Sequence, residues 1–350
     1  MPASVTEVHG ELDGRSVQLF TLRNARNLRV QISELGAHLV SVIWIDDDGG
    51  KQNLTLGHDH FEGWLNNSDC YLGATVGRFG NRIAQGKFSL EGKDYSLATN
   101  NAPGDIPCHL HGGPMGFHTK IWHGELLEES GRHGVRLRTQ SKDGEEGYPG
   151  NLEVTVTYWL TDENELSWHA EATTDKATPI NLINHVYWNL SGDSSQSITD
   201  HRIEIQADVF LPTDAGMIPT GEIRPVAGTP MDFTRPRAIG DGIDNEYEPL
   251  QLAGGYDQCW VLRDFRAGVS DPYEAAVVSY PDTGRTLRVL TNQPGIQFYT
   301  GNFLTGAYQA RAGLCLETGG FPDAPNHSRF PSSILCPGES YCHELVWQIS

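Results

Sequence analysis

The segment LEVTVTYWL, residues 152–160, alternates between two sets of side chains. One set is Val154, Val156 and Tyr158, and the other is Thr155, Thr157 and Trp159. Because successive side chains of an extended chain point to opposite faces of a sheet, this alternation predicts a β-strand. The polar sequence TDEN at 161–164 predicts a turn into a second strand at 166–172.

Similar alternation recurs along the whole chain. We expect further strands at 39–45, 88–97 with a turn at 91–93, 202–207, 286–290 and 341–349. The best helical candidate is a single turn at 60–65, since no longer window has an apolar period near about 3.6 residues. The 39 glycines and 19 prolines supply turns between short strands. These patterns predict an all-β protein, a large antiparallel β-sandwich that forms a single domain over residues 1–350.

Acidic side chains outnumber basic ones by 45 to 25, which gives a formal net charge of −20. Such a surface repels phosphate backbones and anionic lipids, so we expect no nucleic-acid partner and no membrane partner. No apolar run reaches the roughly 18 residues of a membrane-spanning helix, and the first residues lack the pattern of a secretory signal. We therefore expect a soluble, cytoplasmic protein. The six cysteines form no C-x-x-C pair, which favours reduced thiols over a zinc site or disulfides.

Two glycine-containing clusters carry polar side chains. In VGRFGNRI, Asn81 and Arg82 offer the hydrogen-bond donors that sugar hydroxyls need, although a loop with surface arginines explains these residues equally well. In HLHGG, His109 and His111 are expected to share one face of an extended strand. Zinc or iron needs a third protein ligand, and none is near in the sequence. We therefore favour hydrogen-bonding histidines and expect no metal.

Three further clusters place polar groups beside apolar runs: NLINHVYWNL (181–190), GGYDQCW (254–260) and CLETGGFPD (315–323). In the first, Asn184, His185 and Tyr187 must be hydrogen-bonded or face a cavity. In the third, burial would raise the pKa of Glu317 toward the range of a general base. For Asp257 alone, a carboxylate that braces the fold against an arginine is the favoured alternative.

Taken in order, these clusters resemble the aldose 1-epimerase (galactose mutarotase) family over nearly the whole chain, from about Arg15 to Trp347. The similarity also includes the segments 143–150, 211–214, 218–223 and 293–302. Each segment alone is weak evidence for the family, whereas the whole set in this order is highly specific for it. The resemblance implies a large twisted β-sandwich of the galactose mutarotase type, a supersandwich, with a sugar cleft on one side.

The resemblance also implies a set of site residues. It makes Glu317 the general base and His185 the general acid. It gives sugar-holding roles to Asn81, Arg82, His111, Tyr187, Asp257 and Gln297. The assignment of Gln297 is undecided, because Gln293 stands only four residues earlier and could take the same role.

The implied reaction interconverts the α and β anomers of a free hexose such as glucose or galactose. Glu317 would take the anomeric proton while a charged His185 gives one to the ring oxygen, and reclosure after rotation about C1–C2 yields the other anomer. We expect no cofactor, and we expect mutual attraction to lower the pKa of the glutamate and raise that of the histidine. The partner would be a small-molecule aldose, and the protein a monomer or homodimer. Gly80 and Gly319 depart from the common family pattern, which leaves the preferred sugar open.

The residues leave three other functions to be weighed. One is a glycoside hydrolase that uses Asp257 and Glu317 as its carboxylate pair. Another is a catalytically silent sugar-binding module of the same fold, although such a protein would be expected to lose the glutamate or the histidine. The third is an epimerase of hexose 6-phosphates, which would need additional arginine or lysine for the phosphate.

Overall fold

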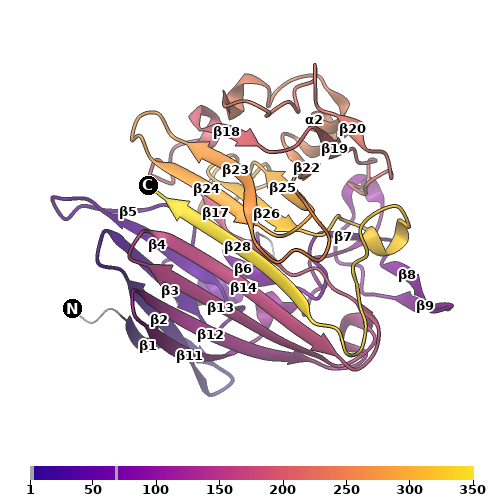
Figure 1. Cartoon of the computed structure of the whole chain (residues 1–350), viewed down its shortest axis with the longest axis horizontal. Coiled ribbons are helices and arrows are strands. Elements are labelled where there is room, and N and C mark those ends of the chain that lie inside the picture. Colours follow the sequence, from indigo (N-terminus) through magenta and orange to yellow (C-terminus); the bar gives the residue numbers. More distant parts are fainter. Residues whose placement is uncertain (1–3, 68–69) are drawn as a thin grey trace.

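The computed structural model describes residues 4–67 and 70–350, and these residues form mainly antiparallel β-structure (Figure 1). A five-stranded sheet has the order β1 (Ser4–Leu12), β2 (Arg15–Arg23), β3 (Leu28–Ser33), β4 (Leu39–Ile45) and β5 (Lys51–Asn53). A nine-stranded sheet has the order β11 (His123–Glu129), β12 (Arg132–Ser141), β13 (Leu152–Thr161), β14 (Glu165–Thr174), β28 (Tyr341–Ile349), β24 (Thr286–Thr291), β23 (Tyr273–Ser279), β18 (Arg202–Ile205) and β21 (Arg237–Ala238). A six-stranded sheet has the order β17 (Tyr187–Trp188), β26 (Leu314–Gly319), β25 (Gly295–Tyr299), β22 (Asp257–Val261), β19 (Val209–Leu211) and β20 (Arg224–Pro225).

Smaller elements connect and cover these sheets. Two-stranded ribbons pair β6 (Ala74–Val76) with β16 (Ile183–His185), β7 (Arg82–Ala84) with β10 (Cys108–Leu110), β8 (Lys87–Leu90) with β9 (Lys93–Ser96), and β15 (Thr178–Pro179) with β27 (Ile334–Leu335). The α-helices are α1 (Phe61–Leu65) and α2 (Glu248–Ala253). Single 3-10 turns span Pro103–Asp105, Phe117–Thr119, Glu145–Gly147, Ile198–Asp200, Ile239–Asp241 and Ala324–Asn326. In the part of the chain that the structure describes, no helix has the length and apolar character of a membrane span.

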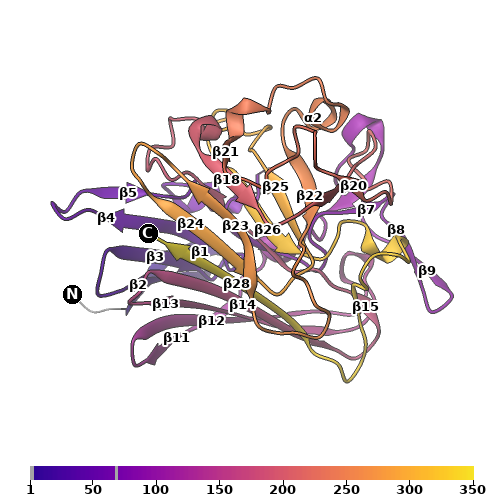
Figure 2. The same ribbon diagram turned by 45° about the horizontal axis from the view of Figure 1, so that its top comes forward.

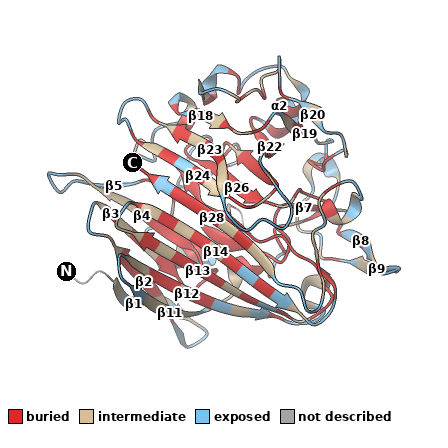
Figure 3. Cartoon of the chain, viewed as in Figure 1, coloured by how far each residue is buried: buried red, intermediate tan, exposed pale blue. Residues whose placement is uncertain are grey.

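The strand predicted at 152–160 is β13, and its alternation decides which face enters the core. Val154, Val156 and Tyr158 are buried, while Thr155 and Trp159 on the other face are half-buried (Figure 3). The Tyr158 hydroxyl donates to the Ala37 carbonyl at 2.9 Å. A buried phenol needs such a partner because an unpaired one would cost about 1–3 kcal/mol. The predicted strands at 39–45 and 341–349 coincide with β4 and β28, and the predicted helical turn is α1.

One apolar core joins the three large sheets. It contains Leu22 from the five-stranded sheet, Trp168 from the nine-stranded sheet, and Trp260 and Leu316 from the six-stranded sheet. Figure 2 shows the sheets arranged around this interior. The β-sandwich predicted from the alternation of side chains is confirmed. One face of the six-stranded sheet packs on this core, and its other face is turned away from the core.

Candidate active site

The outward face of the six-stranded sheet gathers the predicted acidic and amide side chains. Glu317 on β26 lies opposite Gln297 on β25, and Gln297 lies opposite Cys259 on β22. Asp257 precedes Cys259 by two residues and therefore points to the same face. The Gln297 side-chain amide donates to Asp257 Oδ1 at 2.7 Å. Three residues that are distant in sequence thus form one polar row.

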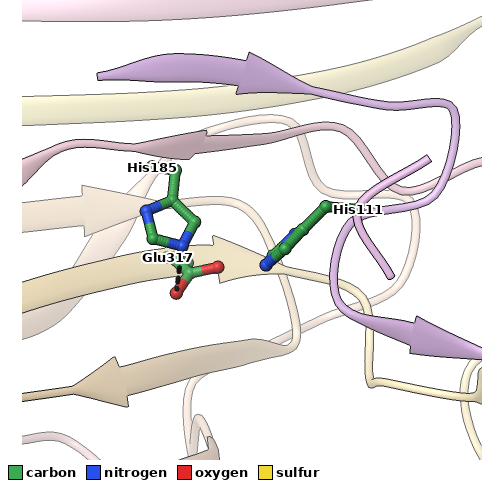
Figure 4. A group of neighbouring side chains, drawn as sticks. All are labelled: His111, His185 and Glu317. Atoms are coloured by element: carbon green, nitrogen blue, oxygen red, sulfur yellow. Dashed lines mark ion pairs between the residues drawn. The ribbon is translucent and has the colours of Figure 1, made fainter. Parts of the chain in front are cut away.

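A two-stranded ribbon brings His185 against this row. His185 ends β16, which pairs with β6, and its Nε2 atom lies 3.6 Å from Glu317 Oε1. Figure 4 shows the imidazole and the carboxylate facing each other, with His111 pointing at the same spot from a separate loop. The predicted acid and base, 132 residues apart by subtraction of their numbers, therefore meet in space.

Cys315, which was not among the predicted site residues, contacts the other side of the imidazole. Its Sγ atom lies 3.6 Å from His185 Nδ1, and it is fully buried. Since Cys315 and Glu317 are two residues apart on β26, they share one strand face. A single strand therefore supplies a partner to each ring nitrogen of His185. Spacing alone could have suggested this once Glu317 was chosen.

His111 is held by a backbone contact that fixes its tautomer. The Asn81 backbone N–H donates to His111 Nδ1 at 3.2 Å, and the His111 N–H donates to the Asn81 carbonyl at 3.1 Å. Because Nδ1 accepts a hydrogen bond, the proton of the neutral ring resides on Nε2. His111 therefore presents an N–H donor to the site.

The expectation that His109 and His111 share one strand face is wrong. The strand β10 ends at Leu110, and His111 has a left-handed φ of 53°. His109 instead bonds the Tyr148 hydroxyl at 2.7 Å, away from the catalytic pair. The turn that follows requires glycine, because a Cβ on Gly112 would lie 1.8 Å from the Gly77 carbonyl oxygen.

Arg82, Tyr187 and Tyr71 complete the surroundings of the pair. The Arg82 guanidinium donates to Asn101 Oδ1 at 3.4 Å and is nine-tenths buried. Tyr187 lies opposite Cys315 in the sheet, and its ring centroid is 5.1 Å from that of His185. The Tyr71 ring, which our sequence analysis missed, packs 4.7 Å from His111 and 5.9 Å from His185.

Burial shifts the pKa values of Glu317 and His185. It raises the pKa of Glu317 well above the ordinary value, and repulsion from Asp257 adds to this rise while Arg82 opposes it. Burial also lowers the pKa of His185 to about 4. Our expectation that mutual attraction would shift both pKa values in the opposite directions is wrong, because desolvation outweighs an attraction across 3.6 Å. Both shifts favour a neutral carboxylic acid beside a neutral imidazole.

Two acceptor atoms of the site have no hydrogen-bond partner among the described residues. They are Glu317 Oε2 and Gln297 Oε1, and both are buried. The two side chains nevertheless retain 5% and 7% exposure, whereas Leu316 between Cys315 and Glu317 retains 1% in the core. Buried acceptors without partners are costly, so this face is built to receive hydrogen-bond donors from a ligand.

The fold brings together three side chains that a metal could in principle use. Ligand atoms of His111, His185 and Glu317 lie within 4.8 Å of one another, so the third ligand that was absent nearby in the sequence arrives through folding. The donor orientation does not fit a metal. To bind a metal, His111 would have to offer the lone pair of Nε2, which places the ring proton on Nδ1. The Nδ1–H group would then face the Asn81 N–H, so that two donors would meet. This arrangement suits a hydroxylated ligand.

Known proteins with similar sequences point the same way. Residues 18–348 match the family described as aldose 1-epimerase. The chain is 41% identical to galactose mutarotase of Homo sapiens, with 99% of each chain covered, and 36% identical to aldose 1-epimerase of Escherichia coli (strain K12), with 96% of each covered. The chain belongs to the aldose 1-epimerase family. A solved structure of galactose 1-epimerase from Lactobacillus acidophilus NCFM has a TM-score of 0.87 at 28% identity and covers 99% of this chain and 98% of that chain.

As a member of the aldose 1-epimerase family, the protein is an enzyme that epimerises carbohydrates. The family resemblance inferred from the sequence is confirmed. Gln297 lies opposite Glu317 in the sheet, whereas the Gln293 amide donates to the Cys342 carbonyl at 3.2 Å.

The two glycines that depart from the family pattern pack against the same neighbours. A Cβ on Gly80 would lie 2.7 Å from Ile183 Cγ1. A Cβ on Gly319 would lie 2.7 Å from Asn181 Oδ1 and 3.0 Å from Ile183 Cγ2. Both positions are therefore crowded by the side chain of Ile183.

Proposed function

We propose that this enzyme interconverts the α and β anomers of a free hexose such as galactose or glucose. The observation that carries the proposal is the buried pair of Glu317 and His185, 3.6 Å apart, beside two acceptor atoms, Glu317 Oε2 and Gln297 Oε1, that have no partner among the described residues. The names of the relatives, galactose mutarotase and aldose 1-epimerase, support the same substrate class.

The reaction moves one proton around the sugar. Glu317 takes the proton of the anomeric hydroxyl, the bond between C1 and the ring oxygen breaks, and the ring oxygen takes a proton from His185. The product is the open-chain aldehyde, with Glu317 protonated and His185 neutral. Rotation about C1–C2 and the reverse transfers close the ring as the other anomer. Acid and base catalysis of this kind each contribute about 10²–10⁴-fold.

The pKa shifts in the free protein oppose the ionised pair that the cyclic sugar requires. Burial raises the pKa of Glu317 and lowers that of His185, which favours the neutral form of each group. Binding of the cyclic sugar must therefore favour the carboxylate and the imidazolium instead. Hydroxyl groups that donate to Glu317 Oε2, together with the charge of Arg82, favour the carboxylate and supply this shift.

The remaining site residues bind and orient the ring. His111 offers its Nε2–H to a sugar oxygen, because Asn81 holds Nδ1 as an acceptor. Asp257 and Gln297 form a bonded pair that accepts hydroxyls, and Arg82 donates to a sugar oxygen. Tyr187 supplies an aromatic wall beside His185.

The substitution Glu317→Gln tests the proposal. It removes the base and keeps the shape, so we expect kcat for anomer interconversion to fall by about 10²–10⁴-fold. Polarimetry of freshly dissolved α-galactose and α-glucose measures it, with Glu129→Gln on the exposed strand β11 as the matched control. Wild-type rates in Glu317→Gln, or release of nitrophenol from an aryl galactoside by the wild type, would contradict the proposal.

A further inference from the structure

A second cluster of metal-ligating side chains lies on the nine-stranded sheet, apart from the catalytic pair. The neighbouring strands β14 and β28 run side by side in Figure 1, with His169 opposite Glu344 and Glu171 opposite Cys342. Directly opposite residues of an antiparallel pair share one face, and so do residues two apart on a strand. The four side chains therefore form a square on one face. The intervening Ala170 and His343 are buried on the other face, so the square lies on the outer side of the sheet.

The distances within the square suit a single ion. Ligand atoms of His169, Cys342 and Glu344 lie within 4.8 Å of one another, and His169 Nδ1 is 2.5 Å from Glu344 Oε1. Zinc binds nitrogen at about 2.0–2.1 Å and thiolate sulfur at about 2.3 Å, which places tetrahedral ligand atoms roughly 3–4 Å apart. Small rotations of the three side chains would bring their ligand atoms from the observed positions to these tetrahedral distances.

The charge of the square also favours a cation. Two carboxylates, Glu171 and Glu344, share one imidazole, and the described residues show no lysine or arginine ion-paired to either carboxylate. A dication would balance this excess of negative charge.

Glu171 occupies the position of a supporting carboxylate. Its Oε2 atom lies 3.4 Å from His169 Nε2, on the far side of the ring from Nδ1. Histidines that ligate a metal commonly donate their other N–H to a carboxylate in this way. The Asn292 side chain further fixes the site, donating to Cys342 Sγ at 3.9 Å and accepting from the Glu344 N–H at 3.0 Å.

We propose that His169, Cys342 and Glu344 bind a divalent cation of the zinc type, with Glu171 orienting the imidazole. Three protein ligands leave a fourth position for water. Cys342 also lines a cavity of about 560 Å³, so solvent has access to the sulfur side of the cluster. The ion would clamp β14 to the C-terminal strand β28, whose buried His343 bonds the Thr318 hydroxyl at 2.8 Å, next to Glu317.

Cobalt binding to the purified full chain tests this site, because a Co²⁺–thiolate bond gives a near-ultraviolet charge-transfer band. We expect one Co²⁺ per chain with this band in the wild type, and loss of the band in Cys342→Ser. The band should persist in Cys336→Ser, the matched control at a half-buried cysteine outside the cluster, and in Glu317→Gln, which removes the carboxylate of the catalytic cluster.

Zinc titration by calorimetry gives the second readout. Cys342→Ser should raise the Kd for Zn²⁺ at least about tenfold, and Glu171→Gln should raise it roughly 10–100-fold. Absence of a thiolate band in the wild type overturns the proposal. So does a band that survives in Cys342→Ser, or one that disappears in Cys336→Ser or Glu317→Gln.

Discussion

At the scale of single residues, burial outweighs mutual attraction in shifting the pKa values of Glu317 and His185. Both side chains are almost completely buried, and burial raises the pKa of Glu317 and lowers that of His185. In the proposed reaction the pair shares one proton, which passes between the two partners through the sugar. Because the two groups lie 3.6 Å apart, they titrate as a unit, and pKa values obtained by experiment would belong to the pair.

The pH dependence of kcat/KM follows from this shared proton. At low pH the pair gains a second proton on His185, whose pKa is about 4, and no base remains. At high pH the shared proton leaves Glu317 as the pH passes its raised pKa, and no acid remains. We expect a bell-shaped profile in polarimetric assays with an acid limb near pH 4 and a plateau at neutral pH. Activity that rises steadily through the alkaline range would contradict a shared proton.

Cys315 offers a second test at this scale. Cys315→Ala removes the polar partner of His185 Nδ1, which makes the imidazolium less stable and shifts the acid limb to lower pH. Cys315→Ser supplies a better acceptor and shifts it to higher pH. For the alanine variant we expect kcat to fall by about tenfold, the equivalent of one hydrogen bond of about 1.4 kcal/mol. Identical pH profiles in both variants would show that the thiol does not position the ring.

The structure brings the predicted pair of Glu317 and His185 to within 3.6 Å, but the pKa shift that we predicted for His185 has the wrong direction. Burial of the carboxylate in CLETGG predicted the raised pKa of Glu317 correctly. The reversed pKa shift of His185 could not be foreseen, since the depth of burial depends on segments distant in the chain. Cys315 looked like an ordinary buried thiol because its contact with His185, 130 residues away, forms only in the folded chain.

At the scale of elements, the VGRFGNRI segment divides into a structural part and a binding part. The buried Arg78 guanidinium donates to five groups that belong to the segment 141–150, among them the Pro149 and Gly150 carbonyls, both at 2.8 Å. Arg82, four residues later, lies close enough to Glu317 to lower the pKa of that carboxyl. The alternative of a loop with surface arginines is wrong, because Arg78 and Arg82 are both buried.

Exchange of these two arginines for methionine separates stability from binding. Arg78→Met leaves buried carbonyls without donors, so we expect the free energy of unfolding to fall by about 3 kcal/mol. Arg82→Met should change that free energy by less than about 1 kcal/mol and raise KM for galactose at least about tenfold. Urea denaturation and polarimetry measure the two effects. The reverse pattern would mean that the roles are exchanged.

Long strands with regular alternation were predictable, and two- or three-residue strands were not. The period of two in LEVTVTYWL located β13 to within one residue. The alternation is clear because one face of the strand is buried in the core and the other is mostly less buried. The short strands β15, β16 and β17 lie in or before the apolar NLINHVYWNL run. Their partners β27, β6 and β26 are distant in the chain, so the local sequence does not show the pairing.

At the scale of the whole molecule, the two faces of the six-stranded sheet have different roles. One face of the six-stranded sheet closes the core with Trp260 and Leu316, and the other carries Asp257, Gln297 and Glu317. The alternation of side chains predicted the all-β class, whereas the order of strands in three large sheets required the structure. Full-length similarity to known epimerases then connects this architecture to carbohydrate chemistry.

The most direct test of the central claim is a crystal structure of Glu317→Gln with bound galactose. We predict that the side chain at position 317 lies within about 3 Å of the anomeric oxygen and His185 Nε2 within about 3 Å of the ring oxygen of the same sugar. A sugar bound instead in the cavity of about 560 Å³ beside Cys342, or contacting only one of the two groups, would contradict the account.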